Sequence, residues 1–300
     1  MSAPDAATAL TSRPGAVGMR AHARVATELR TLSDGTRRSC VRTLRAEVPL
    51  VPRITMAKGP EPWAGGAPEV ARVCLAAGAA GPVGGDRLHL DIDVGAGSAL
   101  VLRDVSATLL LPGPEGARSC TVTRIRVADG GTLVWLPEPL ICARGADHVN
   151  DVRVDLADGA RLVMREEILL GRHREASGRL RQRTRVRLGG KPLFHQDLDL
   201  GTTDARSPAV SGHHRAVGSV LVVDPEGAVA PQAAHRLSGE AVVLPLSGPA
   251  VLVAALAGDN LELRSGLDAG LARLGPPWSP GRAGSTPIGA EAGHEASHVR

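Results

Sequence analysis

The sequence predicts a mainly β protein whose strands stack in layers, as a β-solenoid-like or sandwich body, with one or two helices that include one near the C-terminus. Three observations lead to this prediction. Apolar and polar residues alternate with a period of two in several segments, a glycine turn recurs at a similar spacing, and leucines follow one another at helical spacing before residue 275.

The alternating segments predict strands that are buried on one face. In residues 88–94, leucine, isoleucine and valine alternate with histidine and aspartate. Residues 125–127 and 152–156 repeat the pattern with arginine or aspartate at the polar positions. Successive side chains of a strand point to opposite faces, so we expect each segment to bury one face and to leave the other in water.

An internal repeat joins these strands. Its unit is an apolar strand end, a glycine three residues later and an apolar residue three residues after that, and it occurs in residues 94–100, 127–133 and 156–162. The glycines are 33 and 29 residues apart, and Gly190 with Leu193 forms a fainter fourth copy. Glycine suits a turn residue with positive φ. Repeats of this period favour stacked coils, although glycine turns can also recur by chance in an all-β protein.

The end of the chain's patterned region has a different character. Residues 249–257 are a continuous apolar run, which indicates a buried strand. Asp259 and Glu262 have the spacing of a capping box, which predicts a helix start. Leucines at helical spacing follow, namely Leu263, Leu267, Leu271 and Leu274. Gly275 and the two prolines after it are expected to stop this helix.

Composition limits the class of protein. Residues 1–19 and 276–300 are rich in small residues and proline and are predicted to be disordered, which leaves one β domain over residues 20–275. The core must consist of aliphatic side chains, because only 1% of the 300 residues are aromatic. The four cysteines are too far apart to form a CxxC pair. No apolar run has the length of a membrane helix, so a cytoplasmic location is expected.

The sequence contains one pattern that resembles an enzyme motif. His294, Glu295 and His298 match the HExxH pattern of zinc proteases. The pattern lies two residues from the end of the chain, in a segment without an apolar face, so a solvated tail is the favoured interpretation and weak metal capture the alternative. His213 and His214 are expected on the surface. No GxSxG, P-loop or dinucleotide motif is present, and we predict that the protein is not an enzyme.

Five arginines alternate with other residues in one predicted strand. They are Arg179, Arg181, Arg183, Arg185 and Arg187. A strand would place all five guanidinium groups on one face, where they could contact an acidic protein surface or phosphates. Aromatic residues are absent between them, and the net charge of +4 is too small to argue for nucleic acid by itself. A salt-bridged face in solvent is the simpler interpretation.

Four sequence blocks, in order within residues 25–275, are similar to those of the UreD/UreH family of urease accessory proteins. The blocks are residues 81–97, 133–138, 166–180 and 216–221, and their characteristic residues are Gly84, Gly85, Asp86, Gly97, Trp135, Pro137, Glu166, Gly171, Arg172 and Gly218. The chain departs from the family pattern as well. It lacks the family's lysine near Thr108, has Pro139 in place of an acid, and has Arg165 in place of a tryptophan.

The resemblance implies a β-helical scaffold that is not itself catalytic. Such a scaffold would bind a UreF-like protein, which recruits a UreG-like nickel GTPase, and the assembly would dock on apo-urease. It implies no tightly bound cofactor, transient nickel at most, and neither membrane nor nucleic acid as a partner. Asp86 and Glu166 match acidic family positions and are the candidates for nickel transit, since oxygen ligands release nickel more readily than a Cys/His cage. A turn cap for Asp86 and an arginine pair for Glu166 are the alternatives, as is a nucleic-acid-binding β domain for the whole protein.

Overall fold

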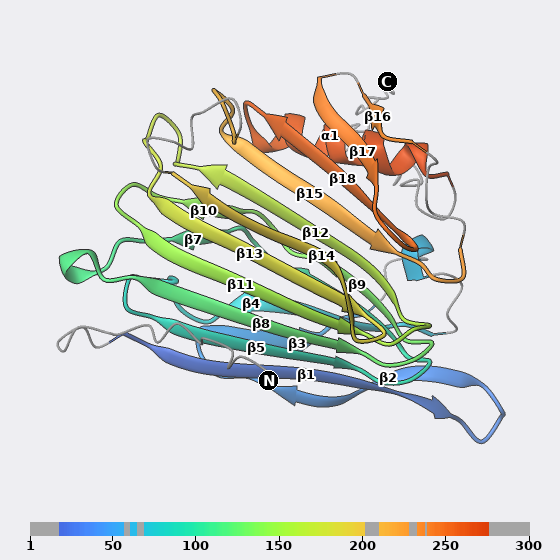
Figure 1. The fold of residues 1–300 in the computed structure, drawn as a ribbon. Coiled ribbons are helices and arrows are strands. Elements are labelled where there is room, and N and C mark those ends of the chain that lie inside the picture. The colour runs from blue at the N-terminus through green and yellow to red at the C-terminus, as the bar shows by residue number, and fades with distance from the viewer. Residues whose placement is uncertain are drawn as a thin grey trace, which may run out of the picture.

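The computed structural model describes residues 18–56, 61–64, 69–201, 210–227, 233–237 and 239–275. Two β-sheets lie face to face and enclose the core (Figure 1). The seven-stranded sheet has the order β14 (Lys191–Leu200), β13 (Arg179–Leu188), β11 (Asp147–Leu156), β8 (Ser119–Val127), β5 (Arg87–Val94), β1 (Arg20–Thr31) and β2 (Arg37–Arg45).

The second sheet has eleven strands. Its order is β16 (His235–Arg236), β17 (Glu240–Pro245), β18 (Ala250–Ala257), β15 (Ala216–Val223), β12 (Arg161–Leu170), β9 (Thr132–Leu136), β6 (Ala99–Asp104), β4 (Ala71–Ala77) and β3 (Leu50–Ile54). The two remaining strands of this sheet lie outside that order: β10 (Leu140–Cys142) pairs with β12 and with β7 (Thr108–Leu110). The short 3-10 helices η1 (Pro62–Ala64) and η2 (Pro114–Gly116) lie in connections.

The central strands form a β-solenoid, and the internal repeat is its coil. β5, β8 and β11 are parallel neighbours in one sheet, and β6, β9 and β12, which follow them, are parallel neighbours in the other. The aligned residues of the repeat are direct partners, since Val127 pairs with both Val94 and Leu156. Leu133 likewise pairs with Leu100 and Leu162. The prediction of stacked coils is therefore confirmed.

The glycine turns between the sheets are of two kinds. Gly97 and Gly130 have φ of 63° and 64°, in the left-handed region that favours glycine, as expected. Gly159 does not lie in this region, but a Cβ there would come within 2.5 Å of the Asp129 carboxylate, which accepts a hydrogen bond from the Gly159 amide. The fourth copy at Gly190 is wrong as a coil, because β13 and β14 form an antiparallel hairpin within one sheet.

Aliphatic side chains fill the space between the sheets, as the composition requires. The largest fully buried side chains of the described residues include Ile92, Leu100, Ile125, Leu133 and Leu162. They come from both sheets and form one hydrophobic cluster. The alternation in β5, where every second side chain is buried, agrees with the predicted strand over residues 88–94.

Helix α1 (Asn260–Arg273) packs on the outer face of the eleven-stranded sheet and is the one α-helix of the described residues. The Asp259 carboxylate accepts a hydrogen bond of 2.9 Å from the Glu262 amide, which confirms the predicted cap. Leu263, Leu267 and Leu271 are buried against β15 and β18. This helix is too short to cross a membrane, and no other helix of the described ranges is a candidate.

Candidate functional site

A cavity of about 160 Å³ lies between the two sheets, at the ends of the strands opposite the glycine turns. The seven-stranded sheet contributes polar side chains from the first half of its strands, including Thr121, Asn150 and Gln182. These three are register partners in adjacent strands, so they form a polar row inside the solenoid. The volume accommodates several water molecules. We call this space cavity 1.

Glu166 projects from β12 into cavity 1. Its Oε1 atom accepts hydrogen bonds from Gln182 Nε2 at 2.6 Å and from Thr184 Oγ1 at 2.8 Å. Gln182 in turn accepts a hydrogen bond of 2.9 Å from Asn150. Burial raises the pKa of Glu166 to about 7, against the opposing effect of the two hydrogen bonds. No described residue donates a hydrogen bond to Oε2, which leaves this oxygen available for a ligand.

Asp104, the last residue of β6, also lines cavity 1, together with Glu138 and Glu167. Burial raises its pKa to about 7, against the opposing effect of the Glu138 backbone. Its Oδ1 atom is buried without a partner among the described residues, and so is the indole nitrogen of Trp135, which lines the same cavity. Buried polar atoms without partners are uncommon and indicate a place for water or a ligand.

His148 lines cavity 1 as a neutral side chain. Its Nδ1 atom lies 2.8 Å from the Ser119 hydroxyl, and burial lowers its pKa to about 3. At neutral pH this imidazole therefore carries no charge that would repel a cation.

A second cavity of about 400 Å³ adjoins the first. Glu166, Ile168 and Gln182 line both spaces, so Glu166 stands at the boundary between them. Cavity 2 lies between β14 and the inner face of β15, β17 and β18, and its walls are mainly apolar. The Glu166 carboxylate is thus reached from two directions.

On the outer face of β12, under helix α1, Glu167 has a fully buried side chain. It accepts hydrogen bonds of 2.6 and 3.0 Å from Arg264 of α1, and Arg165 lies 3.2 Å away. Glu138, which also lines cavity 1, accepts a hydrogen bond of 3.0 Å from Arg264. The hydrogen bonds to Glu167 raise the pKa of Arg264. This ion-pair cluster fixes α1 to the wall of the cavity.

The structure does not bring the two predicted nickel candidates together. Asp86 is buried in a turn, where Oδ1 accepts a hydrogen bond of 2.8 Å from the Met19 amide and Oδ2 one of 2.8 Å from the Val83 amide. It does not line cavity 1 or cavity 2. Both oxygens are used by the backbone, which is the geometry of a turn cap.

The arginine strand is β13, and most of its guanidinium groups have partners. Arg181 and Arg183 both donate to Asp197 of β14, at 2.8 and 2.9 Å. Arg185 donates to Asp151 at 2.7 Å, and Arg187 donates to the Gly190 carbonyl. Arg179 is exposed and has no ion pair with a described residue. The neighbouring strands β11 and β14 therefore neutralise part of the predicted arginine face.

The glycines of the four family-like sequence blocks lie in turns or at close contacts between backbone segments. Gly85 and Gly171 have φ of 102° and 81°. A Cβ at Gly84 would lie 2.4 Å from the Gly113 amide nitrogen, and one at Gly218 would lie 2.8 Å from the Glu166 carbonyl and 3.0 Å from Leu263 of α1. Pro137 and Trp135 line cavity 1, whereas Arg172 lies on the surface and pairs with Glu175 at 2.7 Å.

The remaining candidate ligands that the structure describes do not form a metal centre. The rings of His213 and His214 lie 4.1 Å apart, and His294 and His298 lie outside the described residues. All four cysteines are free thiols. Across the described ranges, no three His, Cys, Asp or Glu side chains are grouped so that they could hold a metal ion.

Sequence reasoning missed Asp104 and the polar row of cavity 1. A signal existed, because Thr121, Asn150 and Gln182 occupy inward positions at which the alternation predicts apolar residues. Such interruptions mark places where the inside of the solenoid is polar. Asp104 offered no comparable signal, since a carboxylate at a strand end is typical of any exposed turn.

Comparison with known proteins gives a consistent result. The model of a family described as UreD urease accessory protein matches residues 6–287. The chain is similar to the urease accessory protein UreD of Streptomyces avermitilis, with 41% identity over 263 residues that cover 87% of this chain and 99% of the relative. It is 40% identical to that of Streptomyces coelicolor over 86% of this chain and 97% of the relative. It is 42% identical to the urease accessory protein UreD of Frankia alni, over 88% of this chain and 96% of the relative.

Proposed function

Since the chain belongs to the UreD urease accessory protein family, whose members are non-catalytic scaffolds of urease maturation, we propose that it holds a UreF-like protein and a UreG-like GTPase against apo-urease while nickel is delivered. A solenoid of two sheets around a continuous hydrophobic core suits a scaffold role. The cytoplasm, expected from the sequence, stays a prediction.

We further propose that nickel passes through the interior of the protein, by way of cavity 2, Glu166 and cavity 1. The observation that carries this proposal is the position of Glu166 at the boundary of both cavities, with one carboxylate oxygen hydrogen-bonded and the other without a partner among the described residues. Gln182 and Thr184 orient the carboxylate, so Oε2 is presented to an entering cation.

Asp104 also lines cavity 1 and would receive the ion from Glu166. Its unpartnered Oδ1 is a free oxygen ligand of the same kind. Carboxylate and water oxygens bind nickel more weakly than sulfur and imidazole do, which favours passage over storage. Asp86 remains a second candidate by its match to the family pattern, although its two oxygens accept backbone hydrogen bonds.

The experiment is activation of apo-urease by the purified accessory proteins, with nickel content measured by mass spectrometry. Glu166→Gln preserves the size of the side chain and its acceptor oxygen but removes the charge. We expect this variant to form the complete complex, seen by size-exclusion chromatography, and to load less nickel. Glu115→Gln, at an exposed position, is the matched control.

Two outcomes separate the parts of the proposal. Full nickel loading by Glu166→Gln would reject the internal path and leave the scaffold role standing. Absence of any complex between the wild-type chain and the three proposed partners would reject the scaffold role itself.

A further inference from the structure

The oxygen atoms of cavity 1 are spread around its walls. The seven-stranded sheet supplies Thr121, Asn150 and Gln182, and the opposite sheet supplies Glu166 and Asp104. No three His, Cys, Asp or Glu side chains of the described ranges are grouped so that they could hold a metal ion. A small divalent cation holds its water tightly and releases it only to several ligands around one point. Cavity 1 offers no such set within the part of the chain that the structure describes.

The positions of Asp104 and Glu166 keep the two carboxylates apart. Their strands, β6 and β12, are separated by β9, which corresponds to about 10 Å at about 4.8 Å per strand spacing. Gln182 and Thr184 of the other sheet hold the Glu166 carboxylate, so it points across the solenoid and not along the sheet towards Asp104. One ion bound directly to both would need their oxygens within about 4 Å, since a metal–oxygen bond is about 2.1 Å long.

A hydrated ion fits this separation. A coordinated water lies about 2.1 Å from the metal and donates a hydrogen bond of about 2.7 Å, so the acceptor is about 4 to 5 Å from the ion. Acceptors on opposite sides of the ion are then about 9 Å apart. The cavity volume of about 160 Å³ exceeds what six water molecules need, at about 10–15 Å³ for each enclosed molecule.

Two further side chains indicate that the cavity holds water. Trp135 is 7% exposed, and its indole nitrogen has no partner among the described residues. This N–H group is a donor only, so it cannot bind a metal and requires an oxygen acceptor such as water. Asn150 donates with Nδ2 to Gln182, and no described residue donates to its Oδ1. That oxygen can accept a hydrogen bond from a coordinated water.

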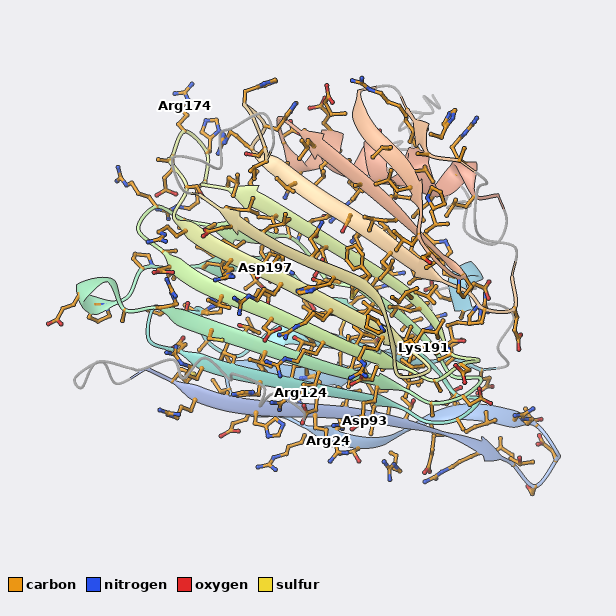
Figure 2. The ribbon with its side chains drawn as sticks, viewed as in Figure 1. Arg24, Asp93, Arg124, Arg174, Lys191 and Asp197 are labelled. Carbon is orange, nitrogen blue, oxygen red and sulfur yellow. The ribbon has the colours of Figure 1, made fainter. Side chains whose placement is uncertain are left out.

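The charges around cavity 1 favour a cation. None of the described residues that line it is Lys or Arg. Figure 2 shows Arg24 and Arg124 on the face of the seven-stranded sheet that is turned away from the other sheet. Glu138 and Glu167 also line the cavity and pair with Arg264, whereas Asp104 Oδ1 has no described partner.

We infer that nickel crosses cavity 1 as its hydrated ion, with Glu166 and Asp104 accepting hydrogen bonds from coordinated water; this inference rests on the internal path proposed above. The hydrated ions of Mn²⁺, Co²⁺ and Ni²⁺ have the same charge and similar size. Preference among them comes from direct bonds to protein nitrogen or sulfur. Cavity 1 therefore does not select nickel, and the choice of metal falls to the protein that supplies the ion.

The test uses hexaamminecobalt(III), an octahedral complex of similar size that does not exchange its ammonia ligands during the experiment. It can donate hydrogen bonds but cannot form a direct bond between the metal and the protein. The full-length chain is dialysed at pH 8 against Ni²⁺ with and without the complex, and bound nickel and cobalt are measured by mass spectrometry. The double variant Asp104→Asn/Glu166→Gln keeps the size of both side chains and removes both charges. Exposed Glu115→Gln is the control, and thermal unfolding checks that each protein is folded.

We expect the complex to displace one equivalent of nickel from the wild type and from Glu115→Gln, with affinities that agree within about twofold. The double variant is expected to bind the complex about tenfold more weakly and to lack the displaceable nickel, because two charged acceptors are lost. Mn²⁺ is expected to bind this site with an affinity within about tenfold of that of Ni²⁺.

Other results would overturn the inference. Equal binding of the complex by the wild type and the double variant would show adventitious surface contact. Nickel that depends on the two carboxylates but is not displaced by the complex would show direct coordination, and the internal path would still stand. A preference for Ni²⁺ over Mn²⁺ of more than about a hundredfold would show the same. Full nickel loading of apo-urease by Glu166→Gln would reject the path and this inference together.

Discussion

The buried carboxylate of Glu166 makes a quantitative prediction about stability. Its pKa is raised from 4.5 to about 7, mainly by burial. A carboxyl group whose pKa is higher in the folded state favours folding below its unfolded pKa and loses this contribution as pH rises through the folded value. The difference of about 2.5 units corresponds to about 3 kcal/mol at 1.36 kcal/mol per unit.

Glu166→Gln removes the titration while keeping the Oε1 acceptor for Gln182 and Thr184. At pH 5, wild-type Glu166 is neutral in the folded protein. The titration of Glu166 is then expected to cause little difference in the free energy of unfolding between the wild type and the variant. At pH 8 the wild type has to keep a buried charge, so the variant is expected to gain stability relative to it by up to about 3 kcal/mol. Water in the cavities makes this figure an upper limit.

The assay is urea unfolding of both proteins at pH 5 and pH 8, with the free energy of unfolding taken by linear extrapolation. Glu115→Gln is the control and is expected to show a difference from the wild type that does not change with pH. A pH-independent difference between the wild type and Glu166→Gln would refute the reasoning. It would mean that Glu166 titrates in the same way in the folded and unfolded chains.

Three further changes test other parts of the structure. His148, whose pKa falls to about 3 in the folded state, destabilises the protein as pH drops below 6.5, so His148→Gln is expected to reduce the loss of Tm between pH 6.5 and pH 4. Asp86→Ala removes two hydrogen bonds to backbone amides and is expected to lower the free energy of unfolding by about 2 kcal/mol; reduced nickel loading without this loss would instead support a transit role. Leu267→Ala leaves a cavity under α1 and is expected to cost about 2–4 kcal/mol, measured by urea unfolding, whereas the exposed Leu261→Ala should cost less than about 1 kcal/mol.

The fold was predictable because each coil of the solenoid corresponds to one copy of a repeat that can be recognised in the sequence. Residues 94–100, 127–133 and 156–162 have the same pattern, and the structure pairs them in register. The helix was predictable for a similar reason, since its cap and its leucine face are local features. The hairpin at Gly190 was not, because a turn within one sheet and a turn between two sheets can have the same local sequence.

The charged face of the solenoid was predictable only in part. Alternation places the five arginines of β13 on one face, as predicted. The carboxylates that pair with them come from other strands, β11 and β14. Register between strands decides which arginines are neutralised, and a single sequence does not specify that register. Arg124, which is exposed and has no ion pair with a described residue, belongs to β8 and not to the arginine strand that the sequence suggested.

Glu166 and Glu167 show most directly what the sequence alone leaves open. They are adjacent residues of the same type in β12, where Glu167 is buried and Glu166 is half-buried. Because a strand points successive side chains to opposite faces, Glu166 enters the solenoid and meets uncharged donors from Gln182 and Thr184, which leaves it close to half protonated at neutral pH. Glu167 meets Arg165 and Arg264 on the other face and anchors α1. If the strand were shifted by one residue, the carboxylate in the proposed nickel path would be held by arginines, and the carboxyl group under α1 would have only uncharged partners. The one-residue difference in position therefore separates the structural carboxylate from the one that remains available to a cation.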